Sequence, residues 1–142
     1  MGEEKLQHSD QRGGTLAIDL GSTTTVVAYQ GATSTTADLL NLPAICSRAG
    51  EIPSLVWEAS QRPLIGRQVL ESGLNDSVDS RLHRDFKSRI GQAEASEQES
   101  ARWAGEQLLQ QIWSRLPGDL PVERLVLTCL LYTSDAADER RR

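Results

Sequence analysis

A single carboxylate interrupts an apolar stretch near the start of the chain, and a hydroxyl-rich turn follows it. Asp19 lies between Ile18 and Leu20, where a buried strand tolerates a charge only if the charge has a partner. Residues 21–25 (GSTTT) then offer backbone N–H groups and hydroxyls suited to phosphate oxygens, while a cation or its water would suit the carboxylate. The pattern predicts a phosphate-and-metal hairpin. The alternative interpretation is an ordinary hairpin turn, in which Asp19 is exposed and the threonines are present because they favour β-strands.

Composition narrows the classes of protein to consider. The chain has 142 residues, a net charge of -5 at pH 7 and a pI near 5, which argues for about one domain and against nucleic acid or an anionic membrane as a partner. The polar residues 1–12 lack the apolar core of a signal peptide, and no window reaches the roughly twenty apolar residues of a membrane span. Cys46 and Cys129 have neither metal-ligand nor disulfide-framework spacing, which favours a reduced compartment. We therefore expect a cytoplasmic protein.

Turn residues divide the first half of the chain into short extended segments. The apolar runs on either side of Gly21 predict a hairpin, and residues 37–42 predict a third strand, so that the three form an antiparallel meander. Residues 48–58 begin with turn residues and end in a short strand. Residues 66–72 are expected to make one or two helical turns closed by Gly73.

The second half predicts helices and one more strand. Leu82, Phe86 and Ile90 are spaced as one apolar helix face, with Gly91 as its C-cap, and Lys87 is expected at the edge of that face. The remaining basic residues of this segment are interpreted as a solvated face.

A longer helix is predicted over residues 96–116. Ser96 and Glu99 form a capping box, and Trp103 and Trp113 are expected to pack against the core. The apolar stripe of this helix comprises Ala101, Ala104, Leu108, Ile112 and Leu116. Residues 122–128 end in the continuous apolar run of a buried parallel strand.

Several other kinds of site lack candidates in this sequence. Neither the P-loop nor the dinucleotide fingerprint occurs. The histidines are His8 and His83, both in polar contexts, and we expect His83 at the surface. A zinc site and a serine–histidine–aspartate triad therefore have no evident residues.

The order of motifs resembles the first lobe of the actin-like ATPase (ribonuclease H-like) fold, an α/β fold shared by sugar kinases, actins and DnaK-type heat-shock chaperones. Residues 17–28 (AIDLGSTTTVVA) closely resemble the first phosphate motif of the chaperones. Residues 52–56 (IPSLV) look like their threonine-proline-serine strand, and residues 86–91 (FKSRIG) like their lysine-arginine-leucine-isoleucine-glycine segment. Residues 64–66 and 124–128 match in the same order. Actins and sugar kinases do not share the lysine segment, so the resemblance is to the heat shock protein 70 family.

The resemblance implies roles for the matching residues. Asp19 would lie near a magnesium ion and contact it through water, and Lys87 would position the attacking water and stabilise charge on the γ-phosphate. The loop touching the β- and γ-phosphates would consist of Gly21, Ser22, Thr23 and Thr24. Ser22 replaces the usual threonine but keeps the hydroxyl. Thr24 stands where the family commonly has asparagine or tyrosine, which leaves its contact open.

The same resemblance implies an ATP-hydrolysing molecular chaperone that assists protein folding in the stress response. Its cofactors would be ATP or ADP with Mg²⁺, and its partners unfolded peptide clients, a J-domain co-chaperone and a nucleotide-exchange factor. The sequence lacks the family's second phosphate loop, adenosine-binding segment and peptide-binding domain. We therefore expect an incomplete first lobe that is inactive by itself.

The expected organisation has three parts: a disordered start (1–13), a partial nucleotide-binding domain (14–128) and a non-native tail (129–142). Residues 129–139 (CLLYTSDAADE) resemble a translated sequencing adapter, although an authentic acidic-then-basic tail is the alternative. Two other functions stay open at this point. One is a sugar or carboxylate kinase of the same superfold. The other is an unstable, non-enzymatic remnant whose incomplete sheet aggregates at its edge.

Overall fold

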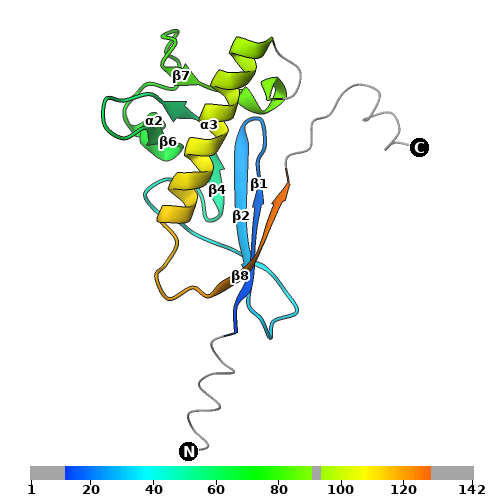
Figure 1. Ribbon diagram of the computed structural model, residues 1–142. Coiled ribbons are helices and arrows are strands. Elements are labelled where there is room, and N and C mark those ends of the chain that lie inside the picture. The colour runs from blue at the N-terminus through cyan, green and yellow to red at the C-terminus, as the bar shows by residue number, and fades with distance from the viewer. Residues whose placement is uncertain (1–11, 91–93, 129–142) are drawn as a thin grey trace, which may run out of the picture.

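The larger of two β-sheets combines a meander with one parallel strand. The computed structural model describes residues 12–90 and 94–128 of the chain (Figure 1). In the order β3-β2-β1-β8, strand β1 is antiparallel to β2 and parallel to β8, and β4 also pairs with β2. The strands are β1 (Gly14–Asp19), β2 (Thr24–Gln30), β3 (Asp38–Leu39), β4 (Glu51–Pro53) and β8 (Val122–Thr128). The predicted meander and parallel strand are confirmed, and the chain has a mixed α/β fold.

Local sequence explains how β1 and β2 lie in this sheet. Leu16 and Ile18 alternate with less buried residues along β1 and point into the core, as do Thr25 and Val27 along β2. The third strand is shorter than the predicted residues 37–42, because only two of its residues pair with β2.

A smaller, all-antiparallel sheet has the order β6-β5-β7. It consists of β5 (Val56–Trp57), β6 (Leu64–Ile65) and β7 (Leu82–His83). The stretch 52–56 is therefore not one strand. Its first part belongs to β4 in the larger sheet, its last to β5 in the smaller one, and Ser54 lies where the chain passes between them.

The helices pack around these sheets. They are α2 (Arg67–Glu71), the 3₁₀ helix η1 (Phe86–Arg89) and α3 (Ala95–Ser114). Figure 1 shows α3 running between the larger sheet and the group formed by α2 and the smaller sheet. The short helix α2 ends as predicted, with Gly73 just beyond it at a φ of 69°.

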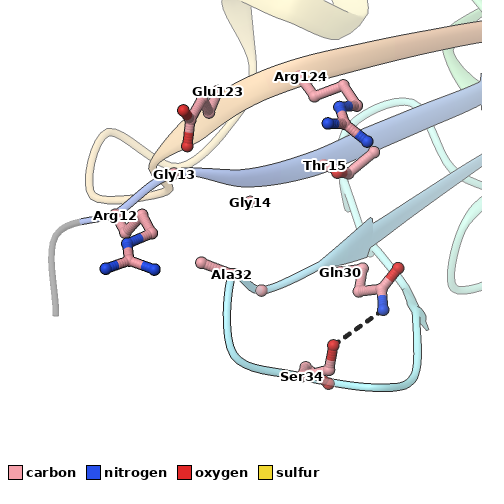
Figure 2. Close-up of a pocket in the computed structure, with 10 residues that line it drawn as sticks. Arg12, Gly13, Gly14, Thr15, Gln30, Ala32, Ser34, Glu123 and Arg124 are labelled. Carbon is pink, nitrogen blue, oxygen red and sulfur yellow. Dashed lines mark hydrogen bonds between the residues drawn. The ribbon is translucent and has the colours of Figure 1, made fainter. Parts of the chain in front are cut away.

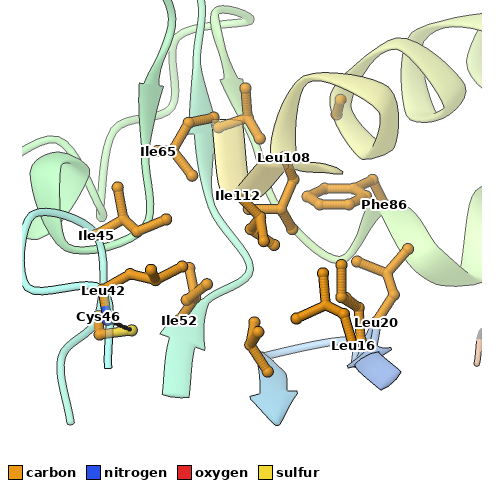
Figure 3. Close-up of a cluster of buried hydrophobic side chains, with 14 of the residues drawn as sticks. Leu16, Leu20, Leu42, Ile45, Cys46, Ile52, Ile65, Phe86, Leu108 and Ile112 are labelled. Atoms are coloured by element: carbon orange, nitrogen blue, oxygen red, sulfur yellow. Dashed lines mark hydrogen bonds between the residues drawn. The ribbon is translucent and has the colours of Figure 1, made fainter. Parts of the chain in front are cut away.

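The hydrophobic core lies between α3 and the two sheets. Figure 3 shows Leu108 and Ile112 of α3 with Phe86 on one side and the isoleucines Ile52 and Ile65 on the other, all at most 1% exposed. The predicted apolar stripe of α3 is thus confirmed at Ala101, Ala104, Leu108 and Ile112, while Leu116 packs against the cluster in a partly buried position.

The predicted helix over residues 81–91 is wrong. Leu82 pairs with Trp57 in the smaller sheet, and only Phe86–Arg89 are helical. Asp85 has a φ of 52°, a left-handed conformation that ends the strand segment and prevents a continuous helix. Phe86 is buried, as the apolar spacing predicts, whereas the position of Leu82 is set by its pairing with Trp57 in the smaller sheet.

Three further expectations need correction. Helix α3 begins at Ala95, with Glu94 as N-cap and without a side-chain cap hydrogen bond, so Ser96 is not the cap. Trp113 is 53% exposed and therefore packs less than expected, whereas Trp103 contacts the core cluster. Strand β8 is parallel, yet it is not buried: its side chains from residue 123 onward are exposed, because it forms the end of the described sheet.

Some predictions lie outside the described residues. These are the disordered start up to residue 11, the C-cap at Gly91 and the non-native tail from residue 129 onward. Within the described ranges, no helix is long and apolar enough to cross a membrane.

Candidate functional site

The predicted carboxylate lies at the last residue of β1 and is exposed. Asp19 is opposite Thr128, the last residue of the parallel strand β8. The Thr128 hydroxyl donates a hydrogen bond of 2.8 Å to Asp19 Oδ1, and the N–H of Leu20 donates to the Thr128 carbonyl at 2.9 Å. The carboxyl ends of two parallel strands therefore meet at Asp19, which is where α/β sheets commonly bind ligands.

The turn after Asp19 needs a glycine at its first position. A Cβ added to Gly21 would lie 2.1 Å from the Thr24 carbonyl oxygen, a contact that no side chain can make. The hydroxyl residues Ser22 and Thr23 are exposed, whereas Gly21 and Thr24 are half-buried. The four predicted phosphate-loop residues are thus together, with two of their hydroxyls open to solvent.

Ser54 ties this turn to the boundary between the two sheets. Its hydroxyl donates to the Gly21 carbonyl at 2.8 Å, and its backbone N–H donates to the Thr23 carbonyl at 2.9 Å. Ser54 is 2% exposed, and its oxygen also lies 2.8 Å from the hydroxyl of the fully buried Thr25. Residues 52–56 resemble a family motif, but their local pattern predicts no site role for Ser54.

The predicted catalytic lysine is on η1, not on a regular helix. Lys87 is 9% exposed, which is rare for a lysine. Its neighbour Phe86 shares the core cluster with Leu20, the residue that follows Asp19. A Cβ built on Gly105 of α3 would contact both Ile90 and Leu20, at 3.6 and 4.0 Å. Helix α3 therefore brings η1 and the start of the turn to the same region of the fold, as Figure 1 also shows.

A concave region lies at the other end of the larger sheet, away from Asp19. This pocket, of about 490 Å³, is lined by the start of β1, the end of β2 and the start of β8 (Figure 2). Arg12, Arg124 and Glu123 contribute charges to it, and Gln30 donates to the Ser34 carbonyl across its rim at 2.8 Å. This pocket therefore does not coincide with the site that the sequence predicts at Asp19. We place the candidate site at Asp19, where a carboxylate and exposed hydroxyl residues adjoin, and η1 packs in the same region of the fold.

His83 is not at the surface, contrary to the sequence expectation. It is 6% exposed, and its Nε2 lies 2.7 Å from Glu58 Oε1 while its Nδ1 lies 3.3 Å from Ser100 Oγ. The ring also contacts Trp103, with centroids 5.2 Å apart. These partners come from two segments distant from His83 in the sequence, the residue after β5 and helix α3, so no local pattern predicts them. The cluster joins α3 to the smaller sheet.

The side chains of the candidate site fit a metal ion that arrives with a nucleotide better than a metal ion held by the protein alone. Among the described residues, no group of three or more histidine, cysteine, aspartate or glutamate side chains is arranged to hold a metal ion. Asp19 is a single carboxylate. Mg²⁺ bound to a nucleotide keeps several waters and needs only one or two carboxylates from the protein, a requirement that Asp19 meets.

Comparison with known proteins adds no family to this picture, since neither protein-family models nor curated proteins give a match to the chain. The class that the structure defines is a mixed α/β protein with a hydroxyl-rich turn at the carboxyl ends of two parallel strands.

Proposed function

We propose that the chain is the N-terminal part of the nucleotide-binding domain of a DnaK-type, ATP-hydrolysing chaperone of the heat shock protein 70 family, with the actin-like ATPase fold. In this proposal the Asp19 turn contacts the terminal phosphates of ATP or ADP. The observation that carries the proposal is the position of Asp19. Its carboxylate ends a strand that is parallel to β8 and precedes a turn with the exposed hydroxyls of Ser22 and Thr23.

The arrangement of β1, β2, β3 and β8 supports this fold assignment. An antiparallel meander is followed, after a helix, by a strand parallel to the first one, in the order that the family resemblance implies. The sheet also puts Asp19 and the turn at the strand ends, where backbone groups are available to a ligand.

The buried position of Lys87 supports its proposed role. Lys87 is mostly buried on a segment that packs in the same region as the turn, and in such surroundings a lysine charge would act more strongly on a bound phosphate than it does in water. Phosphoryl transfer mainly requires such positioned charge and a metal, rather than a covalent intermediate. Mg²⁺ would be held chiefly by the phosphates, with Asp19 contacting one of its waters.

The cellular partners in this proposal rest only on the resemblance to the heat shock protein 70 family. Unfolded peptides, a J-domain co-chaperone and a nucleotide-exchange factor belong to the proposed parent protein and to its cytoplasmic role in protein folding. For this chain we propose phosphate contact without catalysis, because the sequence contains one phosphate loop and the family uses two.

The proposal is tested by NMR titration of the full chain with ATP and Mg²⁺, and separately with AMP. We expect amide shifts at residues 19–24 with ATP, and much smaller shifts there with AMP, which lacks the outer phosphates. Asp19→Asn should weaken the magnesium dependence of these shifts. Asp38→Asn, which changes another exposed aspartate of the same sheet, should not. Shifts confined to the pocket around Arg124 would contradict the proposal.

Hydrolysis provides a second check. The chain should show no ATP turnover above background in a phosphate-release assay. If turnover is found and disappears in Lys87→Ala, the chain is an active enzyme and the claim that it lacks catalysis is wrong.

A further inference from the structure

Two carbonyl groups of the hydroxyl-rich turn point to the same buried residue. The Gly21 carbonyl accepts from the Ser54 hydroxyl at 2.8 Å, and the Thr23 carbonyl accepts from the Ser54 N–H at 2.9 Å. Ser54 is 2% exposed, so both carbonyl oxygens are turned towards the protein interior. Each carries negative partial charge, which would otherwise repel an anion at the exposed side of the turn.

The protons of the two buried hydroxyls can be assigned. A serine hydroxyl has one proton, and that of Ser54 is used in the bond to the Gly21 carbonyl. The contact of 2.8 Å between the Ser54 and Thr25 oxygens must then be donated by Thr25. The bonds form a chain in one direction, from the Thr25 hydroxyl to Ser54 and from Ser54 to the Gly21 carbonyl.

We infer that Ser54 is a positioning residue that gives the turn its preference for anions by holding the carbonyls of Gly21 and Thr23 away from the ligand. This inference rests on the proposed phosphate-binding function of the turn. Ser54 does not touch the ligand. It acts through the turn, leaving the hydroxyls of Ser22 and Thr23 on the exposed side. The ligand class is a polyphosphate, supplied by a nucleotide or by inorganic tripolyphosphate.

Thr25 provides a matched control for Ser54. Both side chains are buried and share one hydrogen bond, so Ser54→Ala and Thr25→Val each remove a buried hydroxyl. Only the first change releases the Gly21 carbonyl. A role in stability alone would therefore affect both variants, whereas a role in anion binding affects Ser54→Ala far more.

The experiment measures binding of inorganic tripolyphosphate to the full chain by NMR, which detects even millimolar affinity. We expect Ser54→Ala to weaken binding about ten-fold, the effect of roughly one hydrogen bond, and Thr25→Val to stay within about two-fold of wild type. Ser54→Cys, whose thiol is a weaker donor, should lie between them and serves if Ser54→Ala does not fold. ATP should follow the same order as tripolyphosphate.

Amide hydrogen exchange of residues 21–24 gives a second readout of the same variants. Faster exchange in Ser54→Ala than in Thr25→Val, at matched global stability, supports the anchoring role. Equal tripolyphosphate affinity in folded Ser54→Ala and wild type overturns the inference, as does an equal loss in both variants. If wild type shows no tripolyphosphate binding, the phosphate-loop function fails and the anion-selecting role of Ser54 fails with it. Faster exchange in Ser54→Ala would then show only that Ser54 anchors the turn.

Discussion

The hydroxyl of Thr128 donates a hydrogen bond of 2.8 Å to the carboxylate of Asp19, although the two residues are 109 positions apart in the sequence. The bond joins the carboxyl ends of β1 and β8. It also orients the carboxylate at the first residue of the candidate site, so that one oxygen is occupied by the protein.

Removing this hydroxyl should have a small and specific effect. We expect Thr128→Val to lower the free energy of unfolding by about 0.5–1.5 kcal/mol, near the lower end because both groups are exposed. Thr128→Ser keeps the donor and should restore most of that loss. Urea unfolding of the variants measures the difference, and equal values for valine and serine would show that the bond contributes nothing.

Gly21→Ala should damage the turn itself. The new Cβ would lie 2.1 Å from the backbone oxygen of Thr24, so the backbone must shift. We expect a loss of about 1–3 kcal/mol in the free energy of unfolding. Gly118→Ala is the matched control because nothing lies within 4 Å of its Cβ, and it should change stability by less than about 0.5 kcal/mol. Similar thermal melts for both variants would contradict the turn geometry.

The His83 cluster should contribute to stability through coupling between Glu58 and His83. Their atoms lie 2.7 Å apart, with His83 buried and Glu58 about half exposed. A double-mutant cycle with His83→Ala and Glu58→Gln should give a coupling energy of about 0.5–2 kcal/mol. Strictly additive effects would mean that Ser100 and Trp103, not Glu58, account for the buried position of the ring.

Acid should break the contact between Asp79 and Arg81. The side-chain hydrogen bond from Arg81, aided by its backbone N–H, lowers the pKa of Asp79 from 3.8 to about 2. Because the native pKa lies below the unfolded one, the contribution of this pair to stability is present above about pH 4 and is lost as the pH falls towards 2. A carboxyl-carbon NMR titration checks the midpoint.

The arginine variants test the cause of that low pKa. Arg81→Met should return the Asp79 midpoint towards 3.8, whereas Arg62→Met, at another exposed arginine, should leave it near 2. An Asp79 midpoint unchanged by Arg81→Met would exclude the hydrogen bonds from Arg81 as the cause.

The exposed strand β8 should promote self-association. Leu125, Val126 and Leu127 are 52%, 41% and 48% exposed, and β8 ends the described sheet. Open apolar edges tend to pair with other chains, and a lysine on the edge opposes this. We expect Val126→Lys to reduce concentration-dependent association in analytical ultracentrifugation. Val78→Lys, at a fully exposed loop position, should not. A wild-type chain that stays monomeric at all concentrations would contradict this expectation.

Local sequence signals are enough to predict several elements of this fold. The glycine between two apolar runs predicted the β1–β2 hairpin, and the spacing of Leu108 and Ile112 predicted the buried face of α3. The apolar run of residues 122–128 predicted a strand. Asp19 and the turn after it can also be recognised from local sequence, because the carboxylate within an apolar run and the hydroxyl residues adjoin one another in the chain.

Other features depend on contacts between residues that are far apart in the sequence, and only the three-dimensional structure shows them. Leu82 and His83 are strand residues because they pair with β5. The apolar spacing of residues 82, 86 and 90 predicts a helix there instead. Ser54 became the anchor of the turn through a hydrogen bond to Gly21, 33 residues away. The exposure of β8 depends on what lies beside it in the sheet, not on its own apolar residues. Periodicity reports which face of a segment is apolar, but pairing and burial are set by long-range contacts that no short stretch of sequence contains.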